Sequence, residues 1–283
     1  MDTLIEAKGL SKNYGSSTAL DNVSFSVDEG RIVGLIGPNG AGKTTALKAI
    51  LGLSPFRGDL KVLGYDPYRQ RSKLMEEVCF IADVAILPRW LKVSQAIEFV
   101  ERVHPKFNPA RAQEFLSKTE IQPNKKVKQL SKGMVAQLHL ALVMAIDVRL
   151  LILDEPTLGL DILFRKNFYQ TLLEDYFDEN RTIIITTHQV EEIEHILTHL
   201  MFIQKGRLVL DQSMENIAEE YVEVLVSPDQ TQAAQALGPI HERSVFGKQL
   251  MLFRGVSRAN LETLGETHTP SVADLFVATM EGR

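Results

Sequence analysis

The segment 37–44 constrains the fold of this chain more than any other part of its sequence. It reads GPNGAGKT and matches the pattern G-x-x-x-x-G-K-[S/T]. An apolar run at 31–36 precedes it, and a segment with helical spacing at 44–51 follows it. A Gly-rich loop in this position can wrap its backbone N–H groups around a polyphosphate, and the helix N-terminus adds positive charge. The sequence therefore predicts a nucleotide site in which Lys43 reaches the β- and γ-phosphates and Thr44 binds Mg²⁺.

The rest of the chain predicts an α/β fold around this loop. Apolar runs without alternation recur at 31–36, 149–154, 181–187 and 200–206, with helical patterns between them. Such runs suit strands that are buried on both faces, so we expect a P-loop NTPase core with a mainly parallel sheet.

Three other regions differ from this core. The first 30 residues alternate like antiparallel strands and predict an N-terminal antiparallel β-subdomain. Residues from about 73 to 135 carry helical patterns broken by prolines and predict an inserted helical subdomain. We therefore expect an ATPase domain at 1–210, followed by a small α+β accessory domain at 217–283.

Composition limits the classes of partner and compartment. The 283 residues carry a formal net charge of -5, so no basic excess favours nucleic acid as a principal partner. The single cysteine, Cys79, excludes an intramolecular disulfide and fits a reducing compartment. No signal peptide is recognisable, and the longest apolar run, 138–153, is too short and too charged to span a bilayer. We expect a cytoplasmic chain that depends on another polypeptide for any membrane-spanning part.

Two further strand ends supply the side chains that a phosphate site needs. The run LLILDEP ends in Asp154, which can hold Mg²⁺ through water, and in Glu155, which could polarise an attacking water. The run IIITTH ends in His188. Open α/β sheets bind ligands at the carboxyl ends of their strands, so we expect His188 to contact the γ-phosphate.

These motifs, in this order, resemble the nucleotide-binding subunit of ATP-binding-cassette (ABC) systems. The resemblance covers about Leu4 to Leu210 and rests on GPNGAGKTT, LSKGM, LILDEPTLGLD and TTH. It implies ATP and Mg²⁺ as cofactors, with Asp154 and Glu155 as the magnesium and catalytic carboxylates and His188 as the switch histidine. The same resemblance implies that the D-loop is Gly159, Leu160 and Asp161, with Asp161 in the catalytic set. It assigns nucleotide contacts to Tyr14, which would stack on adenine, and to Ala19, Gly37, Asn39, Gly40, Ala41, Gly42, Lys43, Thr44 and Thr45.

The segment LSKGM resembles the signature motif of that family. The resemblance implies that it opens a helix and caps the ATP held by a second subunit, with Ser131 and the Gly133 amide contacting the γ-phosphate. Lys132 and Met134 replace the usual glycine and glutamine, and Gln137 stands where the family often has arginine. Asp83 stands where the family usually has a glutamine that contacts Mg²⁺, so we expect Asp83 to be a third magnesium ligand.

One phosphate loop and one signature per chain imply a homodimer, or a heterodimer with a similar subunit, that sandwiches two ATP molecules head to tail. The first hypothesis is a transporter motor, peripheral on the inner face of the cell membrane, that drives separate transmembrane permease subunits. LSKGM and the C-terminal segment SVADLFVATMEG resemble exporters of this kind. The alternative is a soluble ABC-type ATPase, for example in iron–sulfur cluster assembly. The cargo cannot be predicted, because the cassette does not touch it.

Overall fold

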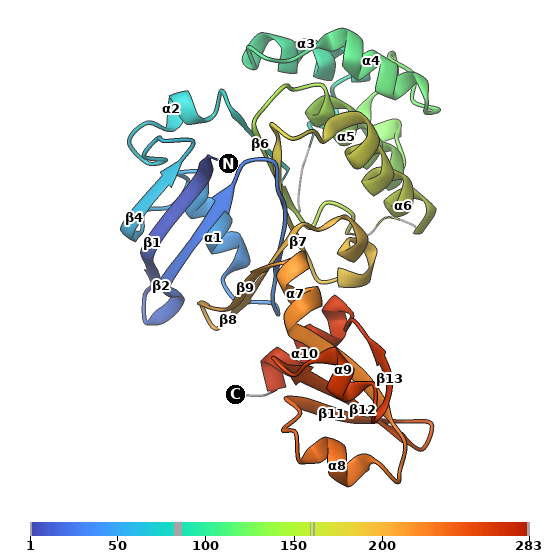
Figure 1. The fold of residues 1–283 in the computed structure, drawn as a ribbon. Coiled ribbons are helices and arrows are strands. Elements are labelled where there is room, and N and C mark those ends of the chain that lie inside the picture. Colours follow the sequence, from blue (N-terminus) through green and yellow to red (C-terminus); the bar gives the residue numbers. More distant parts are fainter. Residues whose placement is uncertain (1, 82–86, 159, 161, 282–283) are drawn as a thin grey trace.

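The computed structural model describes residues 2–81, 87–158, 160 and 162–281, and it arranges them around three β-sheets (Figure 1). The predicted fold class is confirmed: a mainly parallel sheet is combined with an N-terminal antiparallel sheet, an inserted group of helices and a C-terminal α+β unit. The domain boundaries themselves stay a prediction.

The central sheet has the strand order β5-β6-β7-β3-β8-β9. All neighbouring pairs are parallel except β8 and β9. Strands β3, β6 and β7 are buried along their whole length, as expected for Ile- and Leu-rich strands covered on both faces. The six strands are β5 (Val78–Ile81), β6 (Leu150–Asp154), β7 (Thr182–Thr187), β3 (Ile32–Ile36), β8 (His199–Gln204) and β9 (Arg207–Ser213).

This strand order positions the candidate site. Strands β6, β7 and β3 are adjacent, and their registers align Asp154 with Thr186 and Ile36 with Thr187. The three loops that follow these strands therefore leave the same edge of the sheet side by side. They carry the phosphate loop, the acidic pair and His188.

An antiparallel sheet of order β2-β1-β4 covers the N-terminal side of the molecule. Strands β1 (Thr3–Tyr14) and β2 (Ser17–Asp28) confirm the two strands expected there, and β4 (Arg57–Val62) adds a third. Between this sheet and the central sheet lies α1 (Lys43–Ile50), whose Leu47 is fully buried in the core shared by both sheets. The short α2 (Arg71–Leu74) follows β4.

The inserted helices lie between β5 and β6, so β5 falls inside the range expected to be helical. They form the upper end of the molecule in Figure 1, far from the C-terminal sheet. A second helical segment, continuous with the core, follows β6 and ends in a π-helical turn. These elements are α3 (Val93–Val103), α4 (Pro109–Ser117), η1 (Val127–Gln129), α5 (Lys132–Met144), α6 (Ile162–Thr171) and the π-turn η2 (Leu172–Tyr176).

Two single-turn helices follow β7, and the C-terminal unit is built on a sheet of order β11-β12-β10-β13. Valines at alternate positions of β10 give this sheet a small core of its own. The elements are η3 (Val190–Glu192), η4 (Glu194–Ile196), α7 (Met214–Glu220), β10 (Tyr221–Val226), α8 (Thr231–Gln235), β11 (His241–Val245), β12 (Lys248–Arg254), α9 (Arg258–Leu261), β13 (Gly265–His268) and α10 (Val272–Glu281).

Helix α10 joins the C-terminal unit to the central sheet. Its buried Leu275 belongs to the same hydrophobic core as β6, β7 and β8. Phe276 packs edge-on against Phe202 of β8, with ring centroids 5.2 Å apart. Arg243 of β11 forms an ion pair with Asp274 of α10 at 2.9 Å. Helix α10 therefore packs on both the C-terminal unit and the central sheet.

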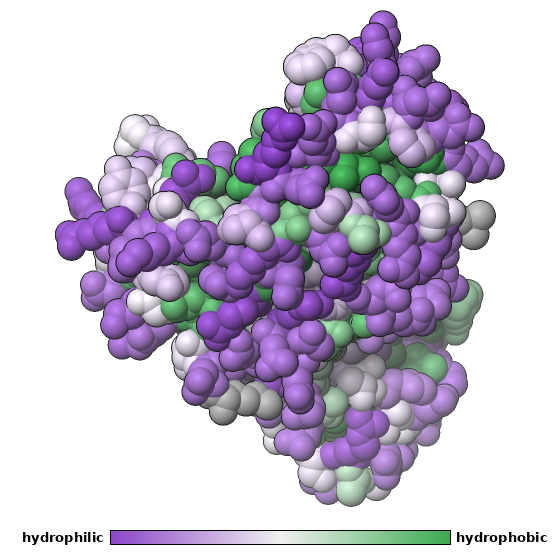
Figure 2. Space-filling view, turned by 90° about the horizontal axis from the view of Figure 1, so that it is seen from above, coloured by the Kyte–Doolittle hydropathy of each residue, from purple (hydrophilic) through white to green (hydrophobic). Residues whose placement is uncertain are grey.

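The surface is mostly hydrophilic in the view of Figure 2. Among the described residues, no helix combines the length and the apolar character that a membrane span requires. Cys79 lies on β5 and is buried, and this burial raises the pKa of its thiol to about 12.

Candidate functional site

A cavity of about 240 Å³ opens at the carboxyl edge of the central sheet. Its lining joins three parts of the chain: the phosphate loop with the start of α1, the end of β6 with the residue that follows it, and the start of β2. The lining residues are Ala19, Asn39, Gly40, Ala41, Gly42, Lys43, Thr44, Thr45, Asp154 and Glu155. The structure thus brings together most of the residues that the sequence assigns to the nucleotide.

Two glycines of the loop are required by close backbone approach. A Cβ on Gly37 would lie 2.2 Å from the carbonyl oxygen of Ile203. Gly42 has φ of 114°, and a Cβ there would lie 2.5 Å from the carbonyl oxygen of Ala19. The loop is therefore held tightly against β8 and β2 before α1 begins at Lys43.

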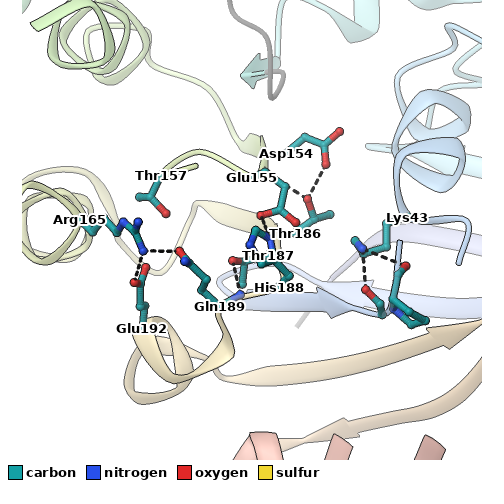
Figure 3. Close-up of polar contacts among 12 residues, drawn as sticks. Lys43, Asp154, Glu155, Thr157, Arg165, Thr186, Thr187, His188, Gln189 and Glu192 are labelled. Atoms are coloured by element: carbon teal, nitrogen blue, oxygen red, sulfur yellow. Dashed lines mark hydrogen bonds and ion pairs between the residues drawn. The ribbon is translucent and has the colours of Figure 1, made fainter. Parts of the chain in front are cut away.

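The Lys43 side chain is buried and folds back over its own loop. Its ammonium donates to the carbonyl oxygens of Gly37 at 2.6 Å and Pro38 at 3.3 Å. Burial lowers the pKa of Lys43, while the nearby carboxylates of Glu155 and Asp154 act to raise it. Lys43 therefore lines the cavity together with Asp154 and Glu155, and Figure 3 shows its ammonium bonded to the carbonyls of its own loop.

The buried carboxylate of Asp154 is held by two hydroxyl groups. Thr44 donates to Oδ2 at 3.1 Å, and Thr186 of the neighbouring strand donates to Oδ1. A hydroxyl and a carboxylate at hydrogen-bonding distance are hard oxygen donors, which is the donor chemistry that Mg²⁺ prefers. Thr44 and Asp154 therefore fit a magnesium ion. Asp83 lies outside the residues that the structure describes.

Glu155 and His188 contact each other, as Figure 3 shows. His188 Nδ1 lies 2.9 Å from Glu155 Oε2, and the glutamate side chain is only 14% exposed, against 50% for the histidine. Glu155 has φ of 50°, in the left-handed region that few non-glycine residues adopt. Its amide donates to both the carbonyl and the hydroxyl of Thr186, which holds it in this conformation.

Arg165 forms a network that the sequence reasoning missed. Its Nε donates to the carbonyl of Leu160 at 2.7 Å, and its Nη1 donates to Glu192 Oε1 at 2.7 Å and to Gln189 Oε1. Arg165 therefore ties the segment after β6 to the loop that carries His188 (Figure 3). No sequence signal in one chain pairs Arg165 with residues 24 and 27 positions away.

Tyr14 lies at the end of β1 and is 51% exposed. Its hydroxyl is 3.5 Å from Ser54 Oγ, and Lys12 Nζ lies 5.0 Å from the centre of its ring. Hydrogen bonding with Ser54 lowers the pKa of Tyr14, and a weaker contribution comes from Thr45 of the phosphate loop. The ring is thus near the cavity and exposed; its stacking role stays a prediction.

Ser131 and Gly133 do not line this cavity. Ser131 is the N-cap of α5, and its Oγ accepts a hydrogen bond from the Met134 amide at 3.2 Å. The signature segment therefore opens a helix, as expected. Gly159 and Asp161, the two D-loop residues on either side of Leu160, lie outside the residues that the structure describes.

Comparison with known proteins gives a consistent result. Residues 20–158 match the model of the ABC transporter family. The chain is 31% identical to the Nod factor export ATP-binding protein I of Cupriavidus metallidurans, over 89% of this chain and 86% of that protein. It is 33% identical to the sulfate/thiosulfate import ATP-binding protein CysA of Bradyrhizobium diazoefficiens, over 76% of this chain and 65% of that protein.

A solved ATP-binding subunit of an ABC transporter superimposes with a TM-score of 0.68 at 27% identity, over 76% of this chain and 92% of that one. Its likeness extends the sequence match to the three-dimensional arrangement of the core. Together with the phosphate cavity, these findings show that the chain belongs to the ABC transporter family, as one of its ATP-binding proteins, which are ATPases coupled to transport.

Proposed function

We propose that this chain is the motor subunit of an ABC exporter. It acts as a head-to-tail dimer that hydrolyses ATP and drives separate transmembrane subunits from the inner face of the cell membrane. The observation that supports the proposal best is the cavity that joins the phosphate loop to Asp154 and Glu155. The same cavity combines a cation, oxygen donors and a carboxylate, which phosphoryl transfer to water requires.

The binding roles follow from the contacts. The Lys43 ammonium now donates to two loop carbonyls, and the phosphates of ATP compete with these for it. Thr44 and Asp154 would hold Mg²⁺, which would supply positive charge to the phosphates. Asp83 is proposed as a third ligand on sequence grounds, and Asn39 to Thr45 supply the loop around the phosphates.

The chemical step is assigned to Glu155. Its carboxylate accepts a proton from the attacking water, while His188, 2.9 Å away, fixes its orientation and contacts the γ-phosphate. Asp161 belongs to the same catalytic set on sequence grounds. Glu155 has a left-handed backbone directly after the last residue of β6, Asp154, and both residues line the cavity.

The dimer completes the site. Ser131 lies outside the phosphate cavity in this chain, so the signature segment would have to meet ATP held by another subunit. The start of α5 presents backbone amides and the Ser131 hydroxyl, which suit the γ-phosphate. Two such chains arranged head to tail would give two complete sites.

The direction of transport rests on a difference between the relatives. The export protein aligns with a larger share of this chain than the import protein does, and 89% of the chain must include part of the C-terminal unit. The match to the export protein therefore extends into the C-terminal unit. This difference favours export.

Hydrolysis by the purified chain tests the chemical assignment. Glu155→Gln is expected to lower kcat by about 10²- to 10⁴-fold, because an amide cannot accept the proton. Glu191→Gln, an exposed glutamate after β7, is the matched control and is expected to retain the wild-type rate. Equal kcat values for wild type and Glu155→Gln would remove Glu155 from the catalytic role.

Co-purification tests the transport assignment separately. The tagged chain is isolated from its native cell in mild detergent, and we expect recovery with a multi-spanning membrane protein. Recovery with soluble partners alone, while the chain still hydrolyses ATP, would replace the transporter motor by a soluble ABC-type ATPase.

A further inference from the structure

Six basic residues gather at the start of the inserted helices, in a chain whose net charge is -5. The two segments that carry them, 84–97 and 121–146, contain no Asp or Glu. No member of the group forms an ion pair with any residue that the structure describes. The group consists of Arg89, Lys92, Lys125, Lys126, Lys128 and Lys132.

The backbone places two of these lysines directly opposite each other. Lys92 and Lys126 form an antiparallel bridge, flanked by hydrogen bonds from Val127 N to Leu91 O and from Val93 N to Lys125 O. This is the non-hydrogen-bonded pairing, in which facing Cα atoms lie about 4.5 Å apart and side chains are closest. Like charges in such a pair are destabilising.

The unfavourable pair is fixed on both sides. The Gln95 side chain accepts from the Lys92 amide at 3.0 Å, and the Gln129 side chain accepts from the Lys126 amide at 2.8 Å. These contacts fix each lysine at the start of its own helical turn, and the two hydrogen bonds between the segments hold the lysines opposite each other. The repulsion is therefore built into the local fold, and an external anion would relieve it.

Buried and exposed side chains alternate around the Lys92–Lys126 pair, and this pattern adds an aromatic residue to the basic surface. Leu91, Val93 and Val127 face the hydrophobic core. Trp90, Lys92 and Lys126 alternate with these residues and are exposed, and Lys128 is exposed in the turn η1 that follows Lys126. Trp90 is 69% exposed, although it is the only tryptophan in the chain.

We propose that these four residues, the Trp90 face, bind the anionic phosphate headgroups of a lipid bilayer. An amphipathic indole settles at the headgroup level, and lysines extend their ammonium groups to lipid phosphates. The chain as a whole carries a formal net charge of -5, so attraction to an anionic membrane needs a local basic surface such as this face. The face lies with α3 at the end of the molecule away from the C-terminal sheet (Figure 1). The inference rests on the proposed function: it seats the motor against the bilayer beside its membrane subunits.

Vesicle binding by the purified full-length chain tests this. The chain is titrated with vesicles of phosphatidylcholine alone and of phosphatidylcholine mixed with phosphatidylglycerol, and binding is followed by flotation. Trp90 reports directly, because fluorescence of the single tryptophan shifts to the blue when the ring enters the headgroup layer. We expect binding and the shift only with the anionic vesicles, and both decrease with added salt.

The triple variant Lys92→Gln, Lys126→Gln, Lys128→Gln is expected to bind the anionic vesicles roughly a hundredfold more weakly, at about fivefold per lysine. Lys61→Gln, Lys73→Gln, Lys248→Gln removes the same charge from exposed positions elsewhere and is expected to bind like the wild type. Lys132 stays unchanged because it adjoins Ser131. ATP hydrolysis without vesicles is expected to be equal in all three proteins, which separates this test from that of the proposed function.

Three results would overturn the proposal: equal binding of the wild type to neutral and anionic vesicles, no binding to either, or equal losses in the two triple variants. A different partner is indicated if the wild type does not bind vesicles and the Lys92, Lys126, Lys128 variant no longer co-purifies with the membrane subunits. In that case the partner of this face is an acidic protein segment.

Discussion

At the scale of single residues, Lys43 shows how the loop prepares for its ligand. Its ammonium is buried and satisfied by two carbonyls of its own loop, close to two carboxylates. The fold does not require a lysine at this position for these contacts, because a water molecule or a shorter side chain could donate hydrogen bonds to the two carbonyl oxygens. A phosphate contact by Lys43, as proposed above, would account for the charge.

Replacement of Lys43 by Met is expected to weaken ATP binding by about 10- to 150-fold, the value of one hydrogen bond to a charged group. Titration with a fluorescent ATP analogue measures the change. Lys48→Met, on the exposed side of the same helix, is the control. Matching affinities for the two variants would exclude a direct phosphate contact by Lys43.

The residues of the phosphate loop could be predicted because the loop is local and its residue spacing is specific. Two glycines stand at points of close backbone approach, and Lys and Thr stand at the start of the helix. Contacts between distant positions could not. The bond between His188 and Glu155 depends on the order of β6 and β7 in the sheet, and Arg165 contacts Gln189 and Glu192 only through the folded chain.

At the scale of elements, Arg165 connects α6 to the loop that holds His188. Its side chain is 17% exposed and does not reach the cavity. The three acceptors of this side chain lie on the segment before α6 and on the loop after β7. It therefore acts as a positioning residue for the His188 loop.

Arg165→Gln is expected to lower kcat about tenfold and to leave the KM for ATP nearly unchanged, because orientation of His188 is lost while phosphate binding is not. Faster amide hydrogen exchange at 188–192 should accompany the loss. Lys166→Gln changes the exposed neighbour on the same helix and should behave like wild type in both measurements. A variant with unchanged exchange and a raised KM would place Arg165 at the nucleotide instead.

Helix α5 carries a histidine, His139, within its largely apolar run. Burial lowers the pKa of His139 from its ordinary value of 6.5. In the window between that value and the lower folded one, the unfolded chain binds the proton and the folded chain does not. The free energy of unfolding therefore falls as pH falls through this window, and this part of stability is complete above it.

His139→Gln is expected to flatten this dependence between pH 7 and pH 5, as measured by urea denaturation at each pH. His195→Gln is the comparison, since it changes a histidine of the short turn η4. A slope that stays at the wild-type value in His139→Gln would assign the pH dependence to other groups.

The elements were predicted where a single pattern dominated: apolar runs for β3, β6, β7 and β8, and alternation for β1 and β2. Short elements were not predicted. β13 has only four residues and pairs with β10 across the sheet. The π-turn at Leu172–Tyr176 has the same spacing of apolar residues as an ordinary helix, so the spacing alone does not distinguish it from a continuous α-helix.

At the scale of the whole molecule, the proposed head-to-tail dimer requires each chain to present two parts that face different ATP molecules. The phosphate cavity is formed by the central sheet, whereas Ser131 caps α5 in the inserted helices. A defect in either part should therefore be repaired by a partner chain that keeps that part intact.

Mixing Lys43→Met chains with Ser131→Ala chains is expected to restore about a quarter of wild-type hydrolysis. Random pairing makes half of the dimers mixed, and each mixed dimer has one intact site of two. Each variant alone should be nearly inactive, since the contacts at stake are hydrogen bonds to a charged phosphate. Steady-state ATP hydrolysis of the mixture measures the effect. No recovery on mixing, with dimers present, would contradict the head-to-tail arrangement.

The burial of Cys79 in β5 has a practical consequence. A thiol with a pKa of about 12 is almost entirely protonated at neutral pH, and its position in the core keeps labelling reagents away. The natural chain is therefore ready for site-specific labelling: a cysteine introduced at any exposed position becomes the one reactive thiol. Fluorophores or spin labels placed in this way can test whether two subunits close on ATP, without removal of the native cysteine.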